Sequence, residues 1–175
     1  MSDDHSAEER EALFSPGGPV EAAKRWLEDI VLRRDVLAAW QGTDPDYRLA
    51  LTQAIIFLND QNPLLEGQDR EALARGLAAE KPVHPMWQSF AGLLTEEFLQ
   101  DLGEINAENW GRVTPRPIAP GYELVFFAHD GGEGAPYSPE MTSHGVLMHL
   151  RDDRWQVAGL SERPAVPGWP PDLGY

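Results

Sequence analysis

The hydrophobic period of this sequence changes once, near Gly103, and this change limits the chain to folds that combine helices with a sheet. Before Gly103, apolar residues recur at intervals of three and four, which is typical of amphipathic helices. After it, apolar and polar residues alternate, which is typical of half-buried strands. The order predicts an α+β fold in which a curved antiparallel or mixed sheet wraps around N-terminal helices.

The first half of the chain is predicted to hold four helices. The first, at 19–31, has its apolar side chains at three- and four-residue spacings on one face: Ala23, Trp26, Leu27, Ile30 and Val31. Pro19 suits the first turn of this helix, because its missing N–H has no partner to lose there. Asp35 can cap a further short turn that ends near Trp40.

Three more helices follow in the predicted order. One is expected at 45–58, with Thr43 or Asp44 as its N-cap and a proline at its first position. A weaker helix lies within 67–81, where the apolar positions are mostly alanine and leucine. A stronger helix, within 84–102, has a continuous apolar side.

The second half of the chain is predicted to form strands. The segment 109–118 is a broken strand, because Pro115 and Pro117 each lack the N–H of a sheet ladder and belong at an edge or a bulge. The segment 122–129 is a clear strand, and 146–159 forms a hairpin.

The hairpin turns at Asp152 and Asp153, which tolerate the positive φ of a two-residue turn. Such a turn would place three cross-strand pairs on one face: Leu150 with Trp155, Met148 with Val157, and Val146 with Gly159. We expect helices to bury this face. The reverse face is also apolar at its far end, so a second surface is expected to cover it.

The 175 residues suit a single domain with one core. We expect an acidic disordered tail at 1–18, the folded domain at 19–163, and a proline-rich segment at 164–175 that packs on the surface, with Trp169 as its anchor. The chain has no cysteine, which excludes disulfides, thiolate metal sites and a cysteine nucleophile.

The charge balance disfavours two classes of partner. The formal net charge is −15, with 29 acidic and 14 basic residues. Such a chain would repel both nucleic acid and anionic lipid. No secretory leader and no apolar stretch of membrane-spanning length is recognised, so we expect a bacterial-type cytoplasmic protein. The acidity favours solubility first and a basic protein partner second.

The layout resembles that of the nuclear-transport-factor-2-like superfamily, and three segments carry the likeness: the helices at 22–40 and 44–58 and the hairpin at 145–161. The resemblance is to polyketide-cyclase-like and uncharacterised bacterial members. It implies a cone-shaped fold with an apolar pocket at its open end and a homodimer formed through the outer face of the sheet. It also implies a short strand near 62–66.

No metal ion or other cofactor is expected. His144 and His149 are five residues apart on one strand, so their side chains point to opposite faces and cannot share an ion. No serine stands in a nucleophile elbow, and the glycine-rich loop at 130–140 is not followed by a helix that could hold phosphate.

Two residues are weak candidates for acid–base catalysis. Glu123 stands in an otherwise apolar strand and could be a buried acid, although a place at the wet end of the strand is the commoner reason for such a residue. His144 could line a cavity, although a histidine that caps the core is commoner. Candidates for a pocket wall are Trp40, Tyr47, Gln53, Trp87 and His144, although each tryptophan is also a typical core anchor.

Three functions stay open at this point. The first is a domain with an apolar pocket that binds a small ligand or a protein and has no assignable reaction. The second is an enzyme in the style of polyketide cyclases, dehydratases or isomerases, with acid–base chemistry inside the cone. The third is a structural dimer that docks a basic protein.

Overall fold

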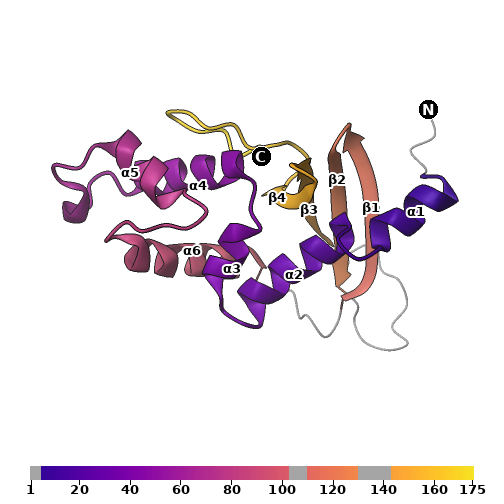
Figure 1. The fold of residues 1–175 in the computed structure, drawn as a ribbon. Coiled ribbons are helices and arrows are strands. Elements are labelled where there is room, and N and C mark those ends of the chain that lie inside the picture. Colours follow the sequence, from indigo (N-terminus) through magenta and orange to yellow (C-terminus); the bar gives the residue numbers. More distant parts are fainter. Residues whose placement is uncertain (1–4, 103–109, 130–142) are drawn as a thin grey trace.

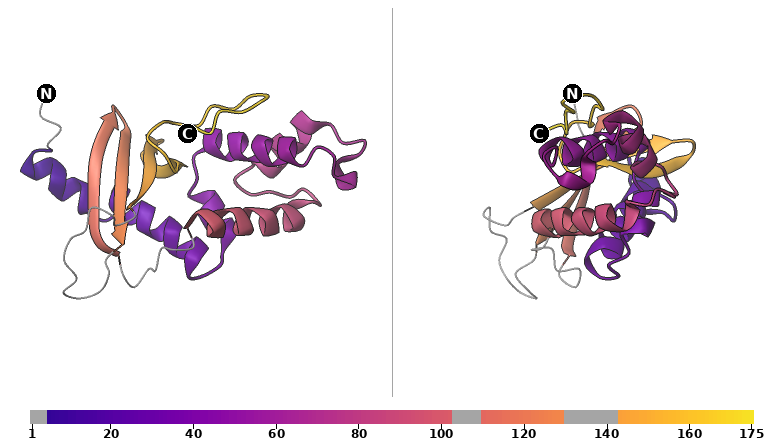
Figure 2. Two further views of the ribbon diagram at one scale, coloured as in Figure 1. Left: turned by 180° about the vertical axis from the view of Figure 1, so that it is seen from behind. Right: turned by 90° about the vertical axis from the view of Figure 1, so that its left-hand side faces the viewer.

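The computed structural model describes residues 5–102, 110–129 and 143–175 and has an α+β architecture (Figure 1). The helices are α1 (Ala7–Phe14), α2 (Pro19–Val31), α3 (Val36–Gln41), α4 (Pro45–Leu58), the 3₁₀ helix η1 (Pro63–Leu65), α5 (Arg70–Leu77) and α6 (Trp87–Leu102). The strands are β1 (Trp110–Ala119), β2 (Tyr122–His129), β3 (Ser143–Arg151) and β4 (Arg154–Gly159). Figures 1 and 2 show an elongated arrangement, with the sheet and α1 at one end and α4, α5 and α6 at the other.

The predicted helices are confirmed, and so are their N-terminal signals. Pro19 occupies the first turn of α2, and the Asp35 side chain accepts a hydrogen bond from the backbone of α3. Asp44 caps α4, directly before Pro45. Because capping depends on local sequence alone, these boundaries could be predicted residue by residue.

Two local features differ from the expectations. Residues 7–14, within the expected disordered tail, form α1, whose capping box pairs Ser6 with Glu9. Leu13 of α1 is buried, which gives the helix a contact with the rest of the molecule. The strand expected near 62–66 is wrong, because this segment forms η1, with Asn62 as its side-chain cap.

The sheet is an open antiparallel meander in the order β1-β2-β3-β4. The strand β1 is continuous over ten residues and lies at an edge, where Pro115 and Pro117 leave no ladder donor unpaired inside the sheet. The other edge strand, β4, is covered. Val157 accepts a backbone hydrogen bond from Asp44 and donates one to Gly42, so the start of α4 is joined to the sheet.

The hairpin turn between β3 and β4 has positive φ at both Asp152 and Asp153, as the sequence predicts. The pairs Leu150–Trp155 and Met148–Val157 are confirmed. The pair Val146–Gly159 is wrong, because Gly159 lies opposite Leu147. A register shift between Leu147 and Met148 places one extra residue, Ala158, on β4, which is the signature of a β-bulge.

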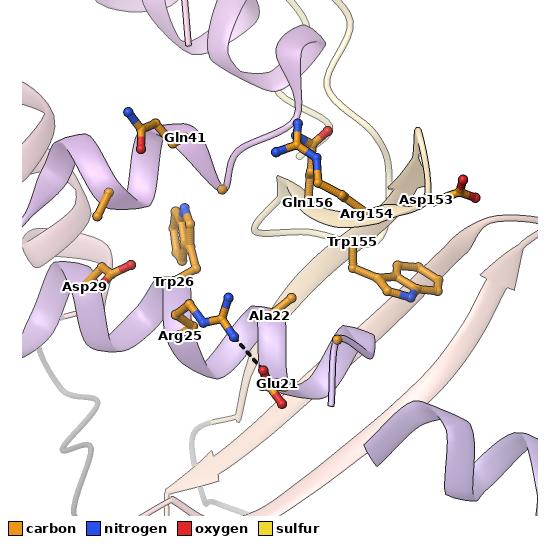
Figure 3. A pocket seen from close by; sticks show the side chains of 13 residues that line it. Glu21, Ala22, Arg25, Trp26, Asp29, Gln41, Asp153, Arg154, Trp155 and Gln156 are labelled. Atoms are coloured by element: carbon orange, nitrogen blue, oxygen red, sulfur yellow. Dashed lines mark hydrogen bonds and ion pairs between the residues drawn. The ribbon is translucent and has the colours of Figure 1, made fainter. Parts of the chain in front are cut away.

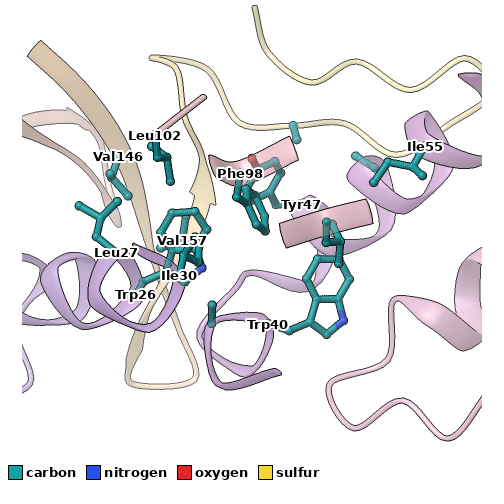
Figure 4. Close-up of a cluster of buried hydrophobic side chains, with 14 of the residues drawn as sticks. Trp26, Leu27, Ile30, Trp40, Tyr47, Ile55, Phe98, Leu102, Val146 and Val157 are labelled. Carbon is teal, nitrogen blue, oxygen red and sulfur yellow. The ribbon is translucent and has the colours of Figure 1, made fainter. Parts of the chain in front are cut away.

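The main core lies where α2 crosses between the sheet and the helical end (Figure 4). Trp26 of α2 packs edge-on against Phe98 of α6, with ring centroids 5.2 Å apart. Such an aromatic pair contributes about 0.5–1.5 kcal/mol beyond the burial of its area. On the sheet side, Val146, Met148 and Val157 are fully buried in the same core. The expectation that helices bury this face is therefore confirmed for these three positions and wrong for Leu150, which is 41% exposed.

The reverse face of the sheet has a smaller core of its own. Leu124, Leu147 and Ala158 are buried within the single chain. The apolar side chains at these positions are thus already buried inside one chain, without a second copy. The homodimer stays a prediction.

The C-terminal segment runs back along α4 (Figure 1). It is fixed by the backbone N–H of Gly168, which donates to Gln53 Oε1 at 2.8 Å, and by the buried Ala165. Trp169, the expected anchor, is 39% exposed, so Ala165 takes that role. Across the described residues, no helix has both the length and the apolarity needed to cross a bilayer.

Candidate functional site

A groove of about 370 Å³ opens between α2, the end of α3 and the turn that begins β4 (Figure 3). We call it the α2–β4 groove. Its lining residues come from three separate parts of the chain: Gly17, Glu21, Ala22, Arg25, Trp26, Asp29, Ala38, Gln41, Gly42, Asp153, Arg154, Trp155 and Gln156. The groove therefore exists only because the fold brings these parts together.

Two indole rings stand on opposite sides of the α2–β4 groove (Figure 3). Trp26 is buried, and its Nε1–H donates to Thr43 Oγ1 at 3.0 Å, which fixes the ring. Trp155 is half-buried and packs only in part against the core, so part of its ring faces the solvent. Small residues such as Ala22 and Gly42 leave the space between the rings open.

The charges on the α2 side of the groove are largely paired among themselves. Arg25 donates to Glu21 at 2.5 Å, and Arg33, next to the groove, donates to Asp29 at 2.6 Å. The hydrogen bond with Asp29 raises the pKa of Arg33, so Arg33 keeps its charge. The α2 wall therefore presents ion pairs to the groove.

Arg154 differs from the other arginines of the groove. Its nearest carboxylate oxygen, on Glu80, is 3.8 Å away, beyond hydrogen-bonding distance, and its side chain is 61% exposed. The neighbouring Gln156 is buried, and its amide makes no hydrogen bond to any residue that the structure describes. Figure 3 shows Arg154 and Gln156 on one side of β4 and Trp155 on the other. The β4 wall thus offers donors that the described part of the fold does not use.

Four of the predicted pocket residues lie in the core instead of lining this groove. Trp40, Tyr47, Gln53 and Trp87 are all buried. Trp40 and Trp87 pack against each other, and Trp40 Nε1–H donates to the carbonyl of Leu77. Burial raises the pKa of Tyr47, which keeps its hydroxyl protonated. Trp40 and Trp87 fill the interior, as the alternative of core anchors expects.

Glu123 is a buried carboxylic acid, as one of the two alternatives for it expects. Its Oε2 lies 3.3 Å from His5 Nε2, a contact that joins β2 to the start of the chain. Burial raises the pKa of Glu123, and His5 lowers it in part. His5 also lines a cavity of about 400 Å³ beside α1 and β1, together with Arg10, Phe14, Val113, Thr114, Pro115, Arg116 and Phe126.

His144 lies in a different place from Glu123. It lines a cavity of about 250 Å³ with Asp101, Leu102, Gly145, Leu160 and Tyr175. His144 is opposite Phe127, four residues along β2 from Glu123, which corresponds to roughly 13 Å of strand length. The two acid–base candidates therefore do not form one site.

A polar cluster lies where α4 meets the sheet, and no local sequence pattern predicts it. His149 Nδ1 lies 2.9 Å from Asp44 Oδ2, and its ring stacks on Tyr122 with centroids 4.1 Å apart. Arg151 approaches the same Asp44 oxygen and also donates to Asp46. These partners are about a hundred residues apart in sequence, so only the fold reveals the cluster. Among the described residues, no group of three or more histidine, aspartate or glutamate side chains is arranged to hold a metal ion.

No protein-family model matches the chain, and neither the search of curated proteins nor that of solved structures finds a significant match. The function proposed below therefore depends on the geometry of this chain.

Proposed function

We propose that this domain binds a small molecule in the α2–β4 groove and that the ligand has a planar apolar body and one anionic group. The volume of about 370 Å³ supports this proposal. Pockets for small ligands typically have volumes of roughly 300–1,000 Å³ and combine aromatic walls with a few polar groups. The groove has this size and this mixture of side chains.

The observation that carries the proposal is the pairing of Trp155 with Arg154 on β4. The half-buried indole of Trp155 offers a flat apolar face. The adjacent guanidinium has no hydrogen bond within the described residues, so it is free to bind a carboxylate, sulfonate or phosphate. Both groups line the groove but project from opposite sides of β4, so a ligand would contact them around the edge of this strand.

The groove is much less acidic than the chain as a whole. The chain as a whole has a formal charge of −15, which would repel anions over most of its surface. The lining of the groove has three carboxylates, on Glu21, Asp29 and Asp153, and two guanidinium groups, on Arg25 and Arg154. The general repulsion is therefore reduced at the groove.

An anilinonaphthalene sulfonate dye is a suitable probe, because it joins a planar apolar body to a single anion. We expect the dye to bind in the micromolar range and to quench tryptophan fluorescence. Replacing Arg154 with Gln removes the cation, and replacing Trp155 with Ala removes the ring. Each change should weaken dye binding at least fivefold. The loss of Arg154 removes a charged hydrogen bond, which contributes about 1.5–3 kcal/mol. The loss of Trp155 removes the apolar face on which the dye would pack.

The matched control is Arg75→Gln. Arg75 is an exposed arginine on α5, outside the groove, with only a 3.6 Å contact to Glu71. Its replacement should leave the affinity for the dye unchanged. Equal loss in Arg154→Gln and Arg75→Gln would mean that the dye responds only to overall charge, and the proposal would then be wrong.

A second candidate function is acid–base chemistry, and the contact between Glu123 and His5 supports it. The buried Glu123, with its raised pKa, contacts His5, which lines a cavity of about 400 Å³. A carboxylic acid with a raised pKa is suited to proton transfer near neutral pH. This arrangement favours acid–base chemistry of the polyketide-cyclase or isomerase type, with His5 in the place that His144 was expected to take. A reaction lost in both Glu123→Gln and His5→Ala, with the fold intact, would support it.

The resemblance to the nuclear-transport-factor-2-like superfamily belongs with these proposals. The open antiparallel sheet and the helix α2 across it are compatible with such a cone. In the proposed scheme, the ligand site lies on the flank of β4, outside the aromatic interior.

A further inference from the structure

A second, smaller hollow lies at the helical end of the molecule. It has a volume of about 60 Å³ and is bounded by the end of α4, η1, α5 and α6. We call it the helical-end socket. Its lining contains no charged residue: Ile55, Ile56, Asn59, Asn62, Leu64, Leu65, Leu73, Leu77, Met86, Ser89, Phe90 and Leu93.

The size of the socket decides what it can hold. A volume of about 60 Å³ is far below the roughly 300 Å³ of the smallest usual ligand pockets. It corresponds to about two water molecules of liquid volume, or to the branched end of one aliphatic side chain. Because its walls are mostly apolar, an aliphatic side chain suits it better than water does.

The rim of the socket is apolar and exposed. Leu64 and Leu93 line it and are 63% and 40% exposed. Single exposed leucines are normal on protein surfaces, but apolar side chains gathered around an apolar hollow are typical of protein-binding surfaces.

Most charges beside the socket are acidic, and the nearest guanidinium, on Arg70, is paired with Asp60. Glu96 and Glu97 follow Leu93 by three and four residues on α6, so they lie one turn away along the helix. Neither makes an ion pair with a residue that the structure describes, and the sequence of α6 contains no basic residue. On the opposite rim, Glu66 follows Leu64 in the same loop. A partner on this surface would therefore gain from positive charge.

We propose that the helical-end socket docks a basic amphipathic helix of another protein. One leucine-sized side chain of the partner enters the socket, apolar neighbours cover Leu64 and Leu93, and flanking lysines or arginines face Glu96 and Glu97. This is the helix-in-groove mode of recognition. A second copy of this chain is the less suitable occupant, because two molecules of charge −15 would repel each other.

A labelled 14-residue helical peptide of leucine and lysine, with leucines at three- and four-residue spacings, tests this surface by fluorescence anisotropy. We expect micromolar binding that weakens with added salt. Leu93→Asn and Leu64→Asn should each weaken binding at least fivefold. The double variant with Glu96→Gln and Glu97→Gln should weaken binding and flatten its salt dependence.

Two control variants show whether the peptide binds at the socket or elsewhere on the protein. Leu58→Asn changes an 80% exposed leucine that does not line the socket and should leave peptide binding within twofold of the unmodified protein. Arg154→Gln, in the α2–β4 groove, should also have no effect, so the socket and the proposed ligand site can fail independently. Because Leu64 and Leu93 are exposed, their polar variants should keep the thermal midpoint within a few degrees.

Two outcomes would overturn the inference. Peptide binding that is unchanged in the Leu64→Asn and Leu93→Asn variants would mean that the peptide only adsorbs to acidic surface. A protein that sediments as a dimer, and becomes monomeric in Leu93→Asn, would mean that a second copy occupies the socket.

Discussion

At the scale of single residues, Asp44 joins the helical end of the molecule to the sheet through both of its carboxylate oxygens. Oδ1 accepts from the backbone N–H of Asp46 and so caps α4. Oδ2 lies 2.9 Å from His149 Nδ1 and 3.4 Å from Arg151 Nε. The sequence predicts the capping role, because that depends on neighbours in the chain. The two contacts to β3 depend on the tertiary fold.

Replacing Asp44 with Ala should therefore cost more than the loss of a cap. A cap contributes about 1 kcal/mol, and loss of the partner of a partly buried cation adds to it, so we expect about 2–4 kcal/mol in the free energy of unfolding. Asp44→Asn keeps a capping oxygen and should cost about half as much. Urea unfolding measures both. Asp46→Asn, at an exposed carboxylate, is the control, and an equal loss in that variant would contradict the double role of Asp44.

Glu123 gives a pH dependence of defined sign. Burial raises its pKa above the ordinary value of 4.5, although the neighbouring His5 lowers it in part and Glu9 raises it further. The folded state thus holds this proton more tightly than the unfolded state does. The contribution of Glu123 to stability falls as the pH rises through its folded pKa and is recovered as the pH falls toward the ordinary value.

Glu123→Gln should remove this dependence. We expect the variant to have a higher thermal midpoint than the unmodified protein at pH 7, and the gap to narrow toward pH 4. Calorimetry across this range measures the difference. Glu162→Gln, at a carboxylate that is 67% exposed, is the matched control and should show no such trend. A variant that is less stable at pH 7 would mean that His5 holds Glu123 in its ionised form.

At the scale of elements, the local sequence predicts one part of the hairpin of β3 and β4 and misses another. The alternation of apolar residues and the two aspartates of the turn predict the strands and the first two cross-strand pairs. The β-bulge at Ala158 has no comparable signal, because it lies where β4 also pairs with the segment before α4. The helix α1 escapes prediction because its sequence is polar on nearly every side, which the periodicity does not distinguish from a tail.

The turn itself offers a test at this scale. Asp152 and Asp153 have φ angles of 51° and 59°, a region that glycine adopts most easily and that asparagine and aspartate tolerate. Asp153→Gly should raise the free energy of unfolding by about 0.5–1 kcal/mol, because an aspartate-glycine pair suits this turn. Asp153→Ala should lower it, since alanine resists positive φ. If chemical denaturation shows both variants to be equally stable, the positive φ does not matter for stability.

At the scale of the whole molecule, the elements could be predicted far better than the sites. Helix caps, periodicity and the turn give the α+β layout from the sequence alone. The α2–β4 groove joins residues from the start of α2, the end of α3 and the start of β4, and no local pattern connects them. Likewise, the contact of His5 with Glu123 spans 118 residues. The predicted aromatic pocket failed to match this groove because composition cannot distinguish rings that line a hollow from rings that fill a core.

The six tryptophans can report on the α2–β4 groove one by one, because each indole N–H gives its own signal in a ¹H–¹⁵N correlation spectrum. The anilinonaphthalene sulfonate dye should be titrated into the labelled protein. We expect the signals of Trp155 and Trp26, which line the groove, to shift together and saturably, while those of the core residues Trp40 and Trp87 stay in place. Saturable shifts confined to the core indoles, or to residues around His5, would mean that the ligand binds elsewhere and that the α2–β4 groove is not the binding site.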